Sequence, residues 1–227
     1  MTNIPKADDQ VDQWRSVMFL YDSALKKVNT KIEILNNEFA NRYDYNPIEH
    51  IKSRLKTADS IVKKLKKDGY EVTIENMMNR LSDIAGIRII CSFTSDIYQI
   101  AEMISKQGDV TVLHVKDYIK HPKPNGYKSY HMVVTVPVYL TDGPVETKVE
   151  IQIRSVAMDF WASLEHKIAY KFEGNAPENL LKELKACADM VDMLDGKMFS
   201  LNEAITVFAR EQRKEDLDGE AVHKTDR

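Results

Sequence analysis

Apolar side chains recur at spacings of three and four through the first 40 residues of the chain. The stripe comprises Val11, Trp14, Met18, Tyr21, Leu25, Val28, Ile32, Leu35 and Phe39. Because an α-helix has about 3.6 residues per turn, this spacing places all of these side chains on one face. The pattern predicts one long amphipathic helix at the amino terminus.

A second helical pattern begins at Asn46, a favourable N-cap residue, with Pro47 in the first turn and Glu49 at the capping-box position. Its apolar positions are Ile48, Ile51, Leu55, Ala58, Ile61 and Leu65. Glycine is favoured just beyond the end of a helix, so we expect this helix to end near Asp68-Gly69.

Period-two alternation and β-branched residues predict four strands farther along the chain. The strands cover roughly residues 86–93, 110–118, 129–140 and 145–154, with a helix over about 96–106 between the first two. Thr141-Asp142-Gly143-Pro144 is typical of a turn between the last two strands. Further helices are expected at about 156–171 and, after a break at Gly174-Asn175-Ala176-Pro177, up to about 210. This order predicts an α+β fold, a mixed sheet with flanking helices.

The pattern divides the chain into a central core at 46–173, terminal helical segments at 1–45 and 174–210, and a tail at 211–227. The tail is charged and lacks periodicity, so we expect it to be disordered. The carboxy-terminal helix carries an apolar stripe of its own, made of Leu181, Leu184, Ala188, Val191, Leu194, Met198, Leu201 and Ile205. Because the two terminal stripes offer more apolar surface than one sheet can cover, we expect both helices to mediate homo-oligomerisation.

The overall charge of the chain is close to balanced, but one segment is strongly basic. A net charge of −3 argues against a general nucleic-acid coat protein, but seven Lys or Arg and a single acid lie between Lys52 and Lys67. Two isolated cysteines, Cys91 and Cys187, indicate a reducing cytoplasm and neither a disulfide framework nor a zinc site. No apolar run reaches the roughly 18 residues of a membrane span, and the polar start lacks a signal-peptide core. These features predict a cytoplasmic protein.

The last strand, Val149-Glu150-Ile151-Gln152-Ile153-Arg154, alternates strictly between β-branched and polar residues. Side chains of a strand alternate between its two faces, so Glu150, Gln152 and Arg154 share one face. A carboxylate, an amide and a guanidinium in a row suit the binding of metal and phosphate. The same alternation also fits the solvated face of an antiparallel edge strand, and the spacing by itself leaves both readings open.

Three further blocks accompany this strand in a fixed order. Ser82-Asp83-Ile84-Ala85-Gly86-Ile87-Arg88 and Asn125-Gly126-Tyr127-Lys128-Ser129-Tyr130-His131 precede it, and Met158-Asp159-Phe160-Trp161-Ala162 with Glu165-His166 follows. Together they resemble the synthetase domain of the RelA/SpoT-type (p)ppGpp alarmone synthetases. The short chain and flanking helices resemble the stand-alone small alarmone synthetases of the RelP and RelQ types, most closely RelP. The resemblance implies a nucleotidyltransferase-like sheet, with residues 46–173 as the catalytic core.

The resemblance also implies the reaction. The β,γ-pyrophosphate of ATP would move to the 3′-hydroxyl of GDP or GTP, giving AMP and ppGpp or pppGpp in stress signalling, with Mg²⁺ as cofactor. It further implies a homotetramer, and some relatives suggest single-stranded RNA as a partner. There is no G-x-x-x-x-G-K-[ST] loop, so side chains must hold the phosphates. No His is followed by Asp, so we expect a synthetase without the hydrolase activity of the large relatives.

The resemblance assigns the donor nucleotide to a basic segment and one strand. Lys56, Ser60, Lys64 and Lys67 are spaced by four, four and three, which on a helix is one face. That face suits the ATP phosphates, although a solvated lysine face has the same spacing. Arg54 and Arg88 are implied to sandwich the adenine, because planar guanidinium groups stack on aromatic rings.

Asp83 and Glu150 are the implied magnesium ligands and catalytic residues, since Mg²⁺ prefers carboxylates and substrate phosphates. A lone Asp at a turn is also a common stabiliser of that turn. The residue matching Glu150 helps in the family to activate the attacking hydroxyl. The acceptor residues implied by the resemblance are Lys123, Asn125, Tyr127, His131, Gln152 and Asp159.

Within the implied acceptor site, Tyr127 would stack on guanine, and Lys123 and His131 would contact the acceptor phosphates. Some relatives carry Asn at the position of Asp159, and an ionised Asp can only accept hydrogen bonds, which still suits the guanine N1–H and amine.

Two other functions fit parts of these patterns. One is a pyrophosphokinase with another acceptor, such as an adenine nucleotide or the end of tRNA, because Tyr127 would stack on any purine. The other is a non-catalytic nucleotide- or RNA-binding regulator. The presence of both candidate metal carboxylates and both arginines argues against it. His50-Ile51-Lys52 stands where RelQ-type proteins tend to carry Phe and Thr, so we do not expect their activation by alarmone.

Overall fold

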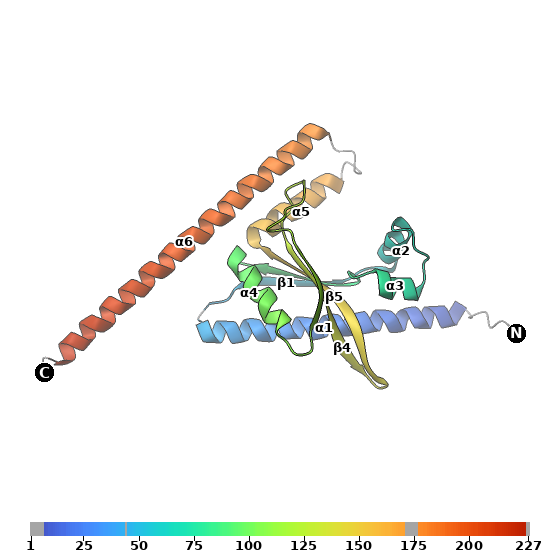
Figure 1. Cartoon of the computed structure of the whole chain (residues 1–227), viewed down its shortest axis with the longest axis horizontal. Helices are drawn as coiled ribbons and strands as arrows, with labels where there is room; N and C mark the ends of the chain where they lie inside the picture. The colour runs from blue at the N-terminus through green and yellow to red at the C-terminus, as the bar shows by residue number, and fades with distance from the viewer. Residues whose placement is uncertain (1–6, 44, 171–176, 226–227) are drawn as a thin grey trace.

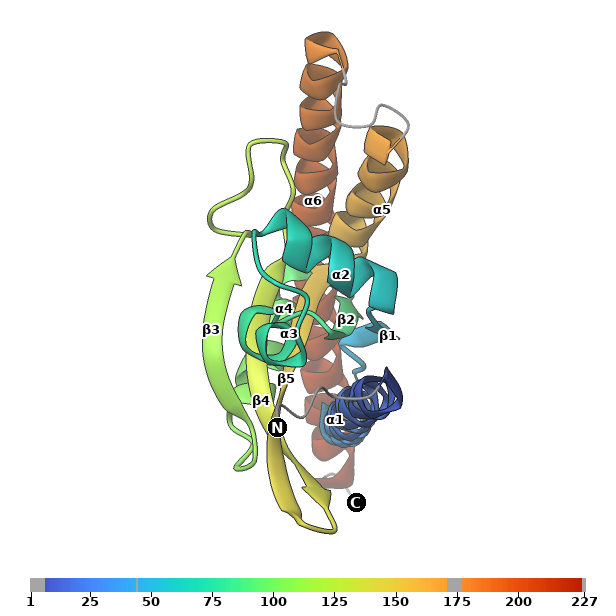
Figure 2. The ribbon, with the colours of Figure 1, turned by 90° about the vertical axis from the view of Figure 1, so that its right-hand side faces the viewer.

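A five-stranded mixed sheet forms the centre of the computed structural model, which describes residues 7–43, 45–170 and 177–225. In chain order the strands are β1 (Ile48–Leu55), β2 (Ala85–Cys91), β3 (Thr111–Asp117), β4 (Tyr130–Leu140) and β5 (Gly143–Ser155). Their order across the sheet is β1-β2-β5-β4-β3, with β2 and β5 parallel and the other neighbours antiparallel. Figure 2 shows β3 as one open edge of this sheet.

Six helices accompany the sheet in the described residues (Figure 1). They are α1 (Ala7–Tyr43), α2 (Ala58–Lys67), α3 (Ile74–Arg80), α4 (Thr94–Ser105), α5 (Val156–Tyr170) and α6 (Glu178–Thr225). The predicted α+β class is therefore confirmed. No helix among the described residues is both long and apolar enough to cross a membrane.

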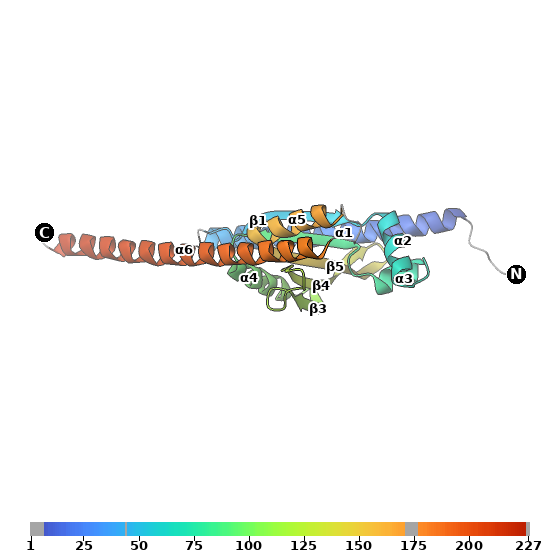
Figure 3. The same cartoon turned by 90° about the horizontal axis from the view of Figure 1, so that it is seen from above.

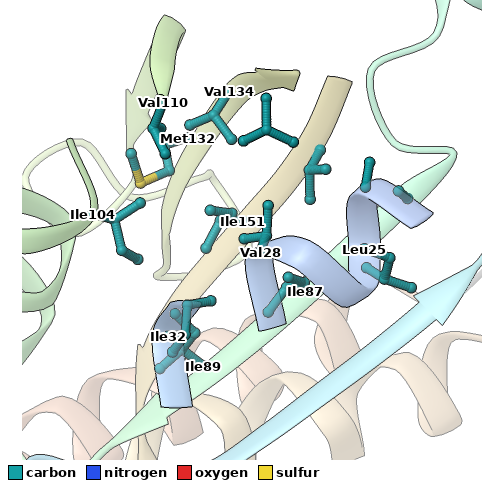
Figure 4. Close-up of a cluster of buried hydrophobic side chains, with 14 of the residues drawn as sticks. Leu25, Val28, Ile32, Ile87, Ile89, Ile104, Val110, Met132, Val134 and Ile151 are labelled. Carbon is teal, nitrogen blue, oxygen red and sulfur yellow. The ribbon is translucent and has the colours of Figure 1, made fainter. Parts of the chain in front are cut away.

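The main core lies between the sheet and the helices α1 and α4, whose apolar side chains join one buried cluster. Figure 4 shows Leu25, Val28 and Ile32 of α1 beside Ile87 and Ile151 of the central strands. The amino-terminal stripe thus packs mainly within its own chain, with Val28 and Ile32 each only 1% exposed. The sheet already covers the buried part of this stripe, and the expected role of the helix in oligomerisation stays a prediction.

The segment predicted as one helix from Asn46 is a strand followed by a helix. β1 pairs antiparallel with β2, and Asn46 Oδ1 accepts from the Ile48 amide at 3.1 Å in a turn rather than a helix cap. Thr57 is the N-cap of α2, and its Oγ1 accepts from the Ser60 amide at 3.3 Å. The helix does end as predicted, with Asp68 as C-cap and Gly69 at φ +78°.

The other predicted strands and helices are confirmed within a few residues, and Gly143 adopts φ +121° in the expected turn between β4 and β5. The short helix α3, capped by Thr73, was not predicted. α6 continues to Thr225, so the expected disordered tail is wrong over most of its length; this region is rich in strong helix formers such as Glu, Gln, Lys and Arg. Most of the predicted break before α6 lies outside the described residues.

Candidate active site

The polar faces of β1, β2 and β5 line an open cleft of about 630 Å³, including its mouth. Its walls include Arg54, Asp83, Gly86, Arg88, Glu150 and Gln152. The register explains the grouping, because Arg88 lies opposite Gln152 on β5 and Gly86 lies opposite both Arg54 and Glu150. The alternation in β5 thus places the polar residues toward a cleft, while Val149, Ile151 and Ile153 are fully buried on the other face.

Asp83 sits just before β2 and binds two ammonium groups. Its Oδ2 accepts from Lys56 Nζ and from Lys64 Nζ, the latter at 2.9 Å. Burial acts to raise the pKa of Asp83, but the two lysines outweigh burial and hold the pKa below its ordinary value. The other oxygen, Oδ1, is buried without a hydrogen-bond partner in the structure. An ionised carboxylate with a free buried oxygen fits one ligand of a hard cation.

Glu150 is the second carboxylate of the cleft. Gln152 Nε2 donates to its Oε2 at 2.9 Å, and His131 Nδ1 lies 3.7 Å from its Oε1. Burial acts to raise the pKa of Glu150, yet hydrogen bonding from His131 and Gln152 lowers it overall, against a smaller opposing effect from Asp83. Both carboxylates are therefore ionised at neutral pH. Among the described residues no three His, Cys, Asp or Glu side chains gather around one point, so a cation here would need oxygens from water or substrate.

The two predicted adenine-stacking arginines both line this cleft, although Arg54 lies on β1 and not on the predicted helix. The side chain of Arg88 is about one-third exposed. Burial lowers its pKa, and the positive charge of the nearby Arg154 lowers it further. Its Nε is buried and has no hydrogen-bond partner in the structure. The structure thus brings Arg54 and Arg88 to one cleft wall, as a stacking site requires.

The predicted lysine face is only partly correct. Lys56 precedes α2 rather than lying on it, while Ser60, Lys64 and Lys67 are on the helix. Lys56 and Lys64 converge on Asp83, whereas Lys67 is exposed. The exposed Ser60 bonds the cap residue Thr57 through its hydroxyl at 2.8 Å.

The loop before β4 carries the predicted acceptor residues. Asn125 Oδ1 accepts from the Tyr127 amide at 3.1 Å, and Asn125 Nδ2 donates to Glu165 Oε1 at 3.2 Å. Gly126 adopts φ +90°, a backbone conformation that glycine tolerates best. The Tyr127 hydroxyl lies 2.8 Å from His131 Nε2, so this ring is held at both its backbone and its tip.

Lys123 lies over two aromatic rings of the same loop region. Its Nζ is 4.9 Å from the ring centroids of both Tyr118 and Tyr127. Tyr118 also meets the ring of His131 edge-on, with centroids 5.2 Å apart. The sequence prediction did not include Tyr118, and no motif pointed to it; only the fold brings it beside the acceptor residues.

Arg154 is a second residue that the prediction left without a role. It is 4% exposed, and its Nη2 donates to the Tyr127 hydroxyl at 2.7 Å and to Gln152 Oε1 at 3.2 Å. Its Nη1 donates to Asp159 Oδ1 at 3.0 Å. The alternation in β5 had placed Arg154 on the polar face with Glu150, and that signal was sufficient to include it.

The chain is similar to known proteins over most of its length. Residues 53–175 match a family described as a region found in RelA / SpoT proteins. The chain is 43% identical over 205 residues to the GTP pyrophosphokinase YwaC of Bacillus subtilis, covering 90% of this chain and 98% of that protein.

Solved structures agree with this match. The crystal structure of small alarmone synthetase 2 from Bacillus subtilis has a TM-score of 0.76 at 45% identity, covering 84% of this chain and 99% of that one. Small alarmone synthetase 1 from the same organism, bound to its product pppGpp, has a TM-score of 0.77 at 34% identity, covering 85% and 97%. The chain belongs to the RelA/SpoT family and, within it, to the small alarmone synthetases.

Proposed function

We propose that this chain is a (p)ppGpp synthetase that transfers the β,γ-pyrophosphate of ATP to the 3′-hydroxyl of GDP or GTP, releasing AMP. One observation carries the proposal: two ionised carboxylates, Asp83 and Glu150, line one cleft together with two arginines. The likeness to GTP pyrophosphokinases over most of the chain supports it.

The donor nucleotide would enter beside β1 and β2. Arg54 and Arg88 offer two planar cations for the adenine, and Lys64 of α2 reaches Asp83 in the same cleft. Lys56 and Lys64 neutralise Asp83 in this structure. With Asp83 bound to a cation, these two ammonium groups would be free to bind the ATP phosphates.

Asp83 and Glu150 would hold Mg²⁺. The free buried oxygen of Asp83 and the mutual repulsion of the two carboxylates both favour a divalent cation between them. When bound, the cation would neutralise charge on the donor phosphates and acidify the attacking hydroxyl.

The acceptor would lie against Tyr127, with its guanine on the ring and its phosphates near Lys123 and His131. Glu150 belongs to the neighbouring strand, and the direction of its pKa shift bears on its role. A carboxylate with a lowered pKa is ionised but weakly basic, so we assign Glu150 to orienting the 3′-hydroxyl and to metal binding.

Asn125, Gln152 and Asp159 complete the proposed acceptor site. In this structure each is already hydrogen-bonded to a neighbour: Asn125 to Glu165, Gln152 to Glu150, and Asp159 to Arg154. These bonds hold the cleft side chains in place before substrate binds, which reduces the ordering cost at binding.

We also propose that the protein is a homotetramer in the cytoplasm and that single-stranded RNA is a further ligand. The middle of α6 carries exposed apolar side chains, at Leu194, Met198, Leu201 and Ile205, that its own chain leaves uncovered. Figure 3 shows α6 extending beyond the sheet. Light scattering of the purified protein at micromolar concentration tests the assembly, and a monomer would refute it.

The direct test is incubation with labelled ATP and Mg²⁺ plus GDP, GTP, GMP or an adenine nucleotide, followed by chromatography. We expect labelled ppGpp with GDP and pppGpp with GTP, together with AMP. Product with the adenine nucleotide alone would indicate a sister pyrophosphokinase. Binding without any transfer would indicate a regulator. Breakdown of added ppGpp would contradict the synthetase-only assignment.

A further inference from the structure

One face of α6 lies directly behind the acceptor loop. Leu184, Ala188, Asp192 and Asp195 are spaced by four, four and three residues, which is one face of a helix. The Leu184 carbonyl accepts from Trp161 Nε1 of α5 at 3.0 Å, so the helix is tied to α5 at this end of the face.

The closest approach is between Ala188 and Gly126. A Cβ added to Gly126 would lie 2.5 Å from Ala188 Cβ and 3.1 Å from Lys185 Cδ, and the first distance is too short for real carbon atoms. A glycine opposite an alanine therefore lets the loop backbone touch the helix. The next residue, Tyr127, packs against the small cluster of Trp161, Ala162 and Ala188. The helix thus contacts both the turn and the ring that would hold guanine.

Two acidic residues fix the helix beyond this point, on the carboxy-terminal side of Ala188. Lys128 Nζ lies 2.5 Å from Asp192 Oδ1, which ties the loop beyond Tyr127 to α6. Asp195 is 8% exposed, and its Oδ2 accepts from Ser155 Oγ at 2.6 Å and from Thr94 Oγ1 at 3.2 Å. Ser155 ends β5, the strand that carries Glu150. A buried carboxylate with two hydroxyl donors strongly resists sliding of the helix along its axis.

We propose that α6 is a positioning element of the acceptor site. Ala188 and Asp192 hold loop 125–128, so that Tyr127 keeps its place beside His131 and Arg154. Asp195 fixes the helix on the end of β5. This inference rests on the proposed function, since it gives the loop its role as acceptor platform. The donor residues lie on β1, β2 and α2, which do not carry these contacts. Disturbing the face should therefore act on the acceptor and spare ATP.

The sharpest test compares Ala188→Leu with Ala186→Leu. Ala186 is exposed on the same turn of helix, so the control adds the same side chain without touching the loop. A misplacement of about 1 Å can cost on the order of 100-fold in rate, so we expect the KM for GDP to rise at least about tenfold in Ala188→Leu. The KM for ATP and the binding of an ATP analogue should stay within about twofold of wild type, a change of less than about 0.5 kcal/mol.

A second pair of variants, which changes no side-chain volume appreciably, controls for misfolding. Asp192→Asn removes the ion pair with Lys128, while Asp189→Asn removes the exposed pair within the helix between Asp189 and Lys185. We expect Asp192→Asn to raise the GDP KM about two- to fivefold, in keeping with a partly exposed pair, and Asp189→Asn to leave it unchanged. The double exchange Lys128→Asp with Asp192→Lys should restore much of the loss, which a general loss of stability would not allow.

Equilibrium binding of GDP, measured with thermal melting and light scattering, separates this inference from the proposed function. Weaker GDP binding by Ala188→Leu with an unchanged melting temperature supports positioning, even if wild type forms no alarmone. Unchanged GDP affinity in both Ala188→Leu and Asp192→Asn overturns it. Equal losses for GDP and ATP, or no rescue by the double exchange, also overturn it in favour of a merely structural helix.

Discussion

Asp159 Oδ1 accepts a hydrogen bond from Arg154 Nη1 at 3.0 Å, and the same oxygen lies 3.4 Å from Arg88 Nη1. Arg88 belongs to the donor wall of the cleft, whereas Arg154 holds the hydroxyl of Tyr127. One carboxylate oxygen therefore joins the two halves of the site. The recognition of guanine by Asp159 stays a prediction, whereas its ion pairs with two guanidinium groups are contacts of the structure.

Arg154→Lys should weaken use of the acceptor. Lysine has a single ammonium and lacks the planar fork that reaches both Tyr127 and Asp159. We expect the KM for GDP to rise about tenfold, the equivalent of roughly 1.4 kcal/mol, with a smaller change for ATP. Steady-state kinetics with each nucleotide varied in turn measure this. Arg42→Lys, on the exposed end of α1, is the matched control, and equal behaviour of the two variants would contradict the role of Arg154.

Tyr127→Ala should impair acceptor use far more than ATP binding. Stacking is worth about 1–3 kcal/mol per base, or roughly 5- to 150-fold in affinity. Tyr127→Phe keeps the ring but loses the hydroxyl contacts to His131 and Arg154, so its defect should be clearly smaller. A wild-type KM for GDP in Tyr127→Ala would show that the ring does not carry the base.

Glu150→Gln should reduce turnover at least about 100-fold, because it removes the charge that binds metal and orients the 3′-hydroxyl. The fold should survive, since the neighbours of Glu150 in β5 supply the core contacts. Glu146→Gln, at an exposed position of the same strand, should be neutral. Alarmone formation is measured together with circular dichroism. Near-normal synthesis by Glu150→Gln would show that the polar face of β5 is solvated and has no role in catalysis.

Asp83→Asn should likewise abolish turnover while leaving ATP-analogue binding on Arg54 and Arg88 largely intact. The variant leaves Lys56 and Lys64 without their counter-charge and weakens Mg²⁺ binding. Titration of activity with Mg²⁺ should show a higher requirement or no activity at all. Asp59→Asn, exposed on α2, serves as control. Full activity of Asp83→Asn at ordinary Mg²⁺ would remove Asp83 from the metal site.

Asp109 should make the fold sensitive to strong acid. Hydrogen bonds from Lys31 and Lys27 of α1 lower the pKa of Asp109 from 3.8 to about 2. A lowered pKa stabilises the fold fully above the unfolded value of 3.8, and this contribution is lost as pH falls toward 2. Because the side chain is about one-third exposed, we expect only about 1 kcal/mol.

Chemical unfolding of Asp109→Asn at pH 7 and pH 2 measures this contribution. The variant should be less stable than wild type at pH 7, and the difference should shrink at pH 2. Asp142→Asn, in the exposed turn of the β4–β5 hairpin, should show no such dependence. A difference between wild type and Asp109→Asn that is equal at both pH values would contradict the ion-pair explanation.

Local pattern was sufficient for most of the sheet and for the face that two of the proposed site residues share. In β5 the alternation itself assigns Glu150 and Gln152 to one face, because the two faces of a strand are decided by period alone. The helical stripe of α1 and the glycine turn at Gly143 follow from similarly local rules.

Where the local sequence suits both a helix and a strand, the neighbouring elements in the fold decide which one forms. Residues 48–55 have apolar spacing that suits a helix, yet β2 supplies an open edge whose backbone groups pair with them, so they form β1. The pairing moves Arg54 from a helix to a cleft wall beside Arg88.

The role of α6 also depends on tertiary structure. Its sequence shows only one apolar stripe, and the structure divides that stripe into a part at Ala188 that docks on the acceptor loop and an exposed distal part. Sequence alone determined which side chains share a face, because that depends on backbone period. Only the tertiary structure decided what each face meets, because contacts such as Gly126 with Ala188 or Arg154 with Tyr127 join residues far apart along the chain.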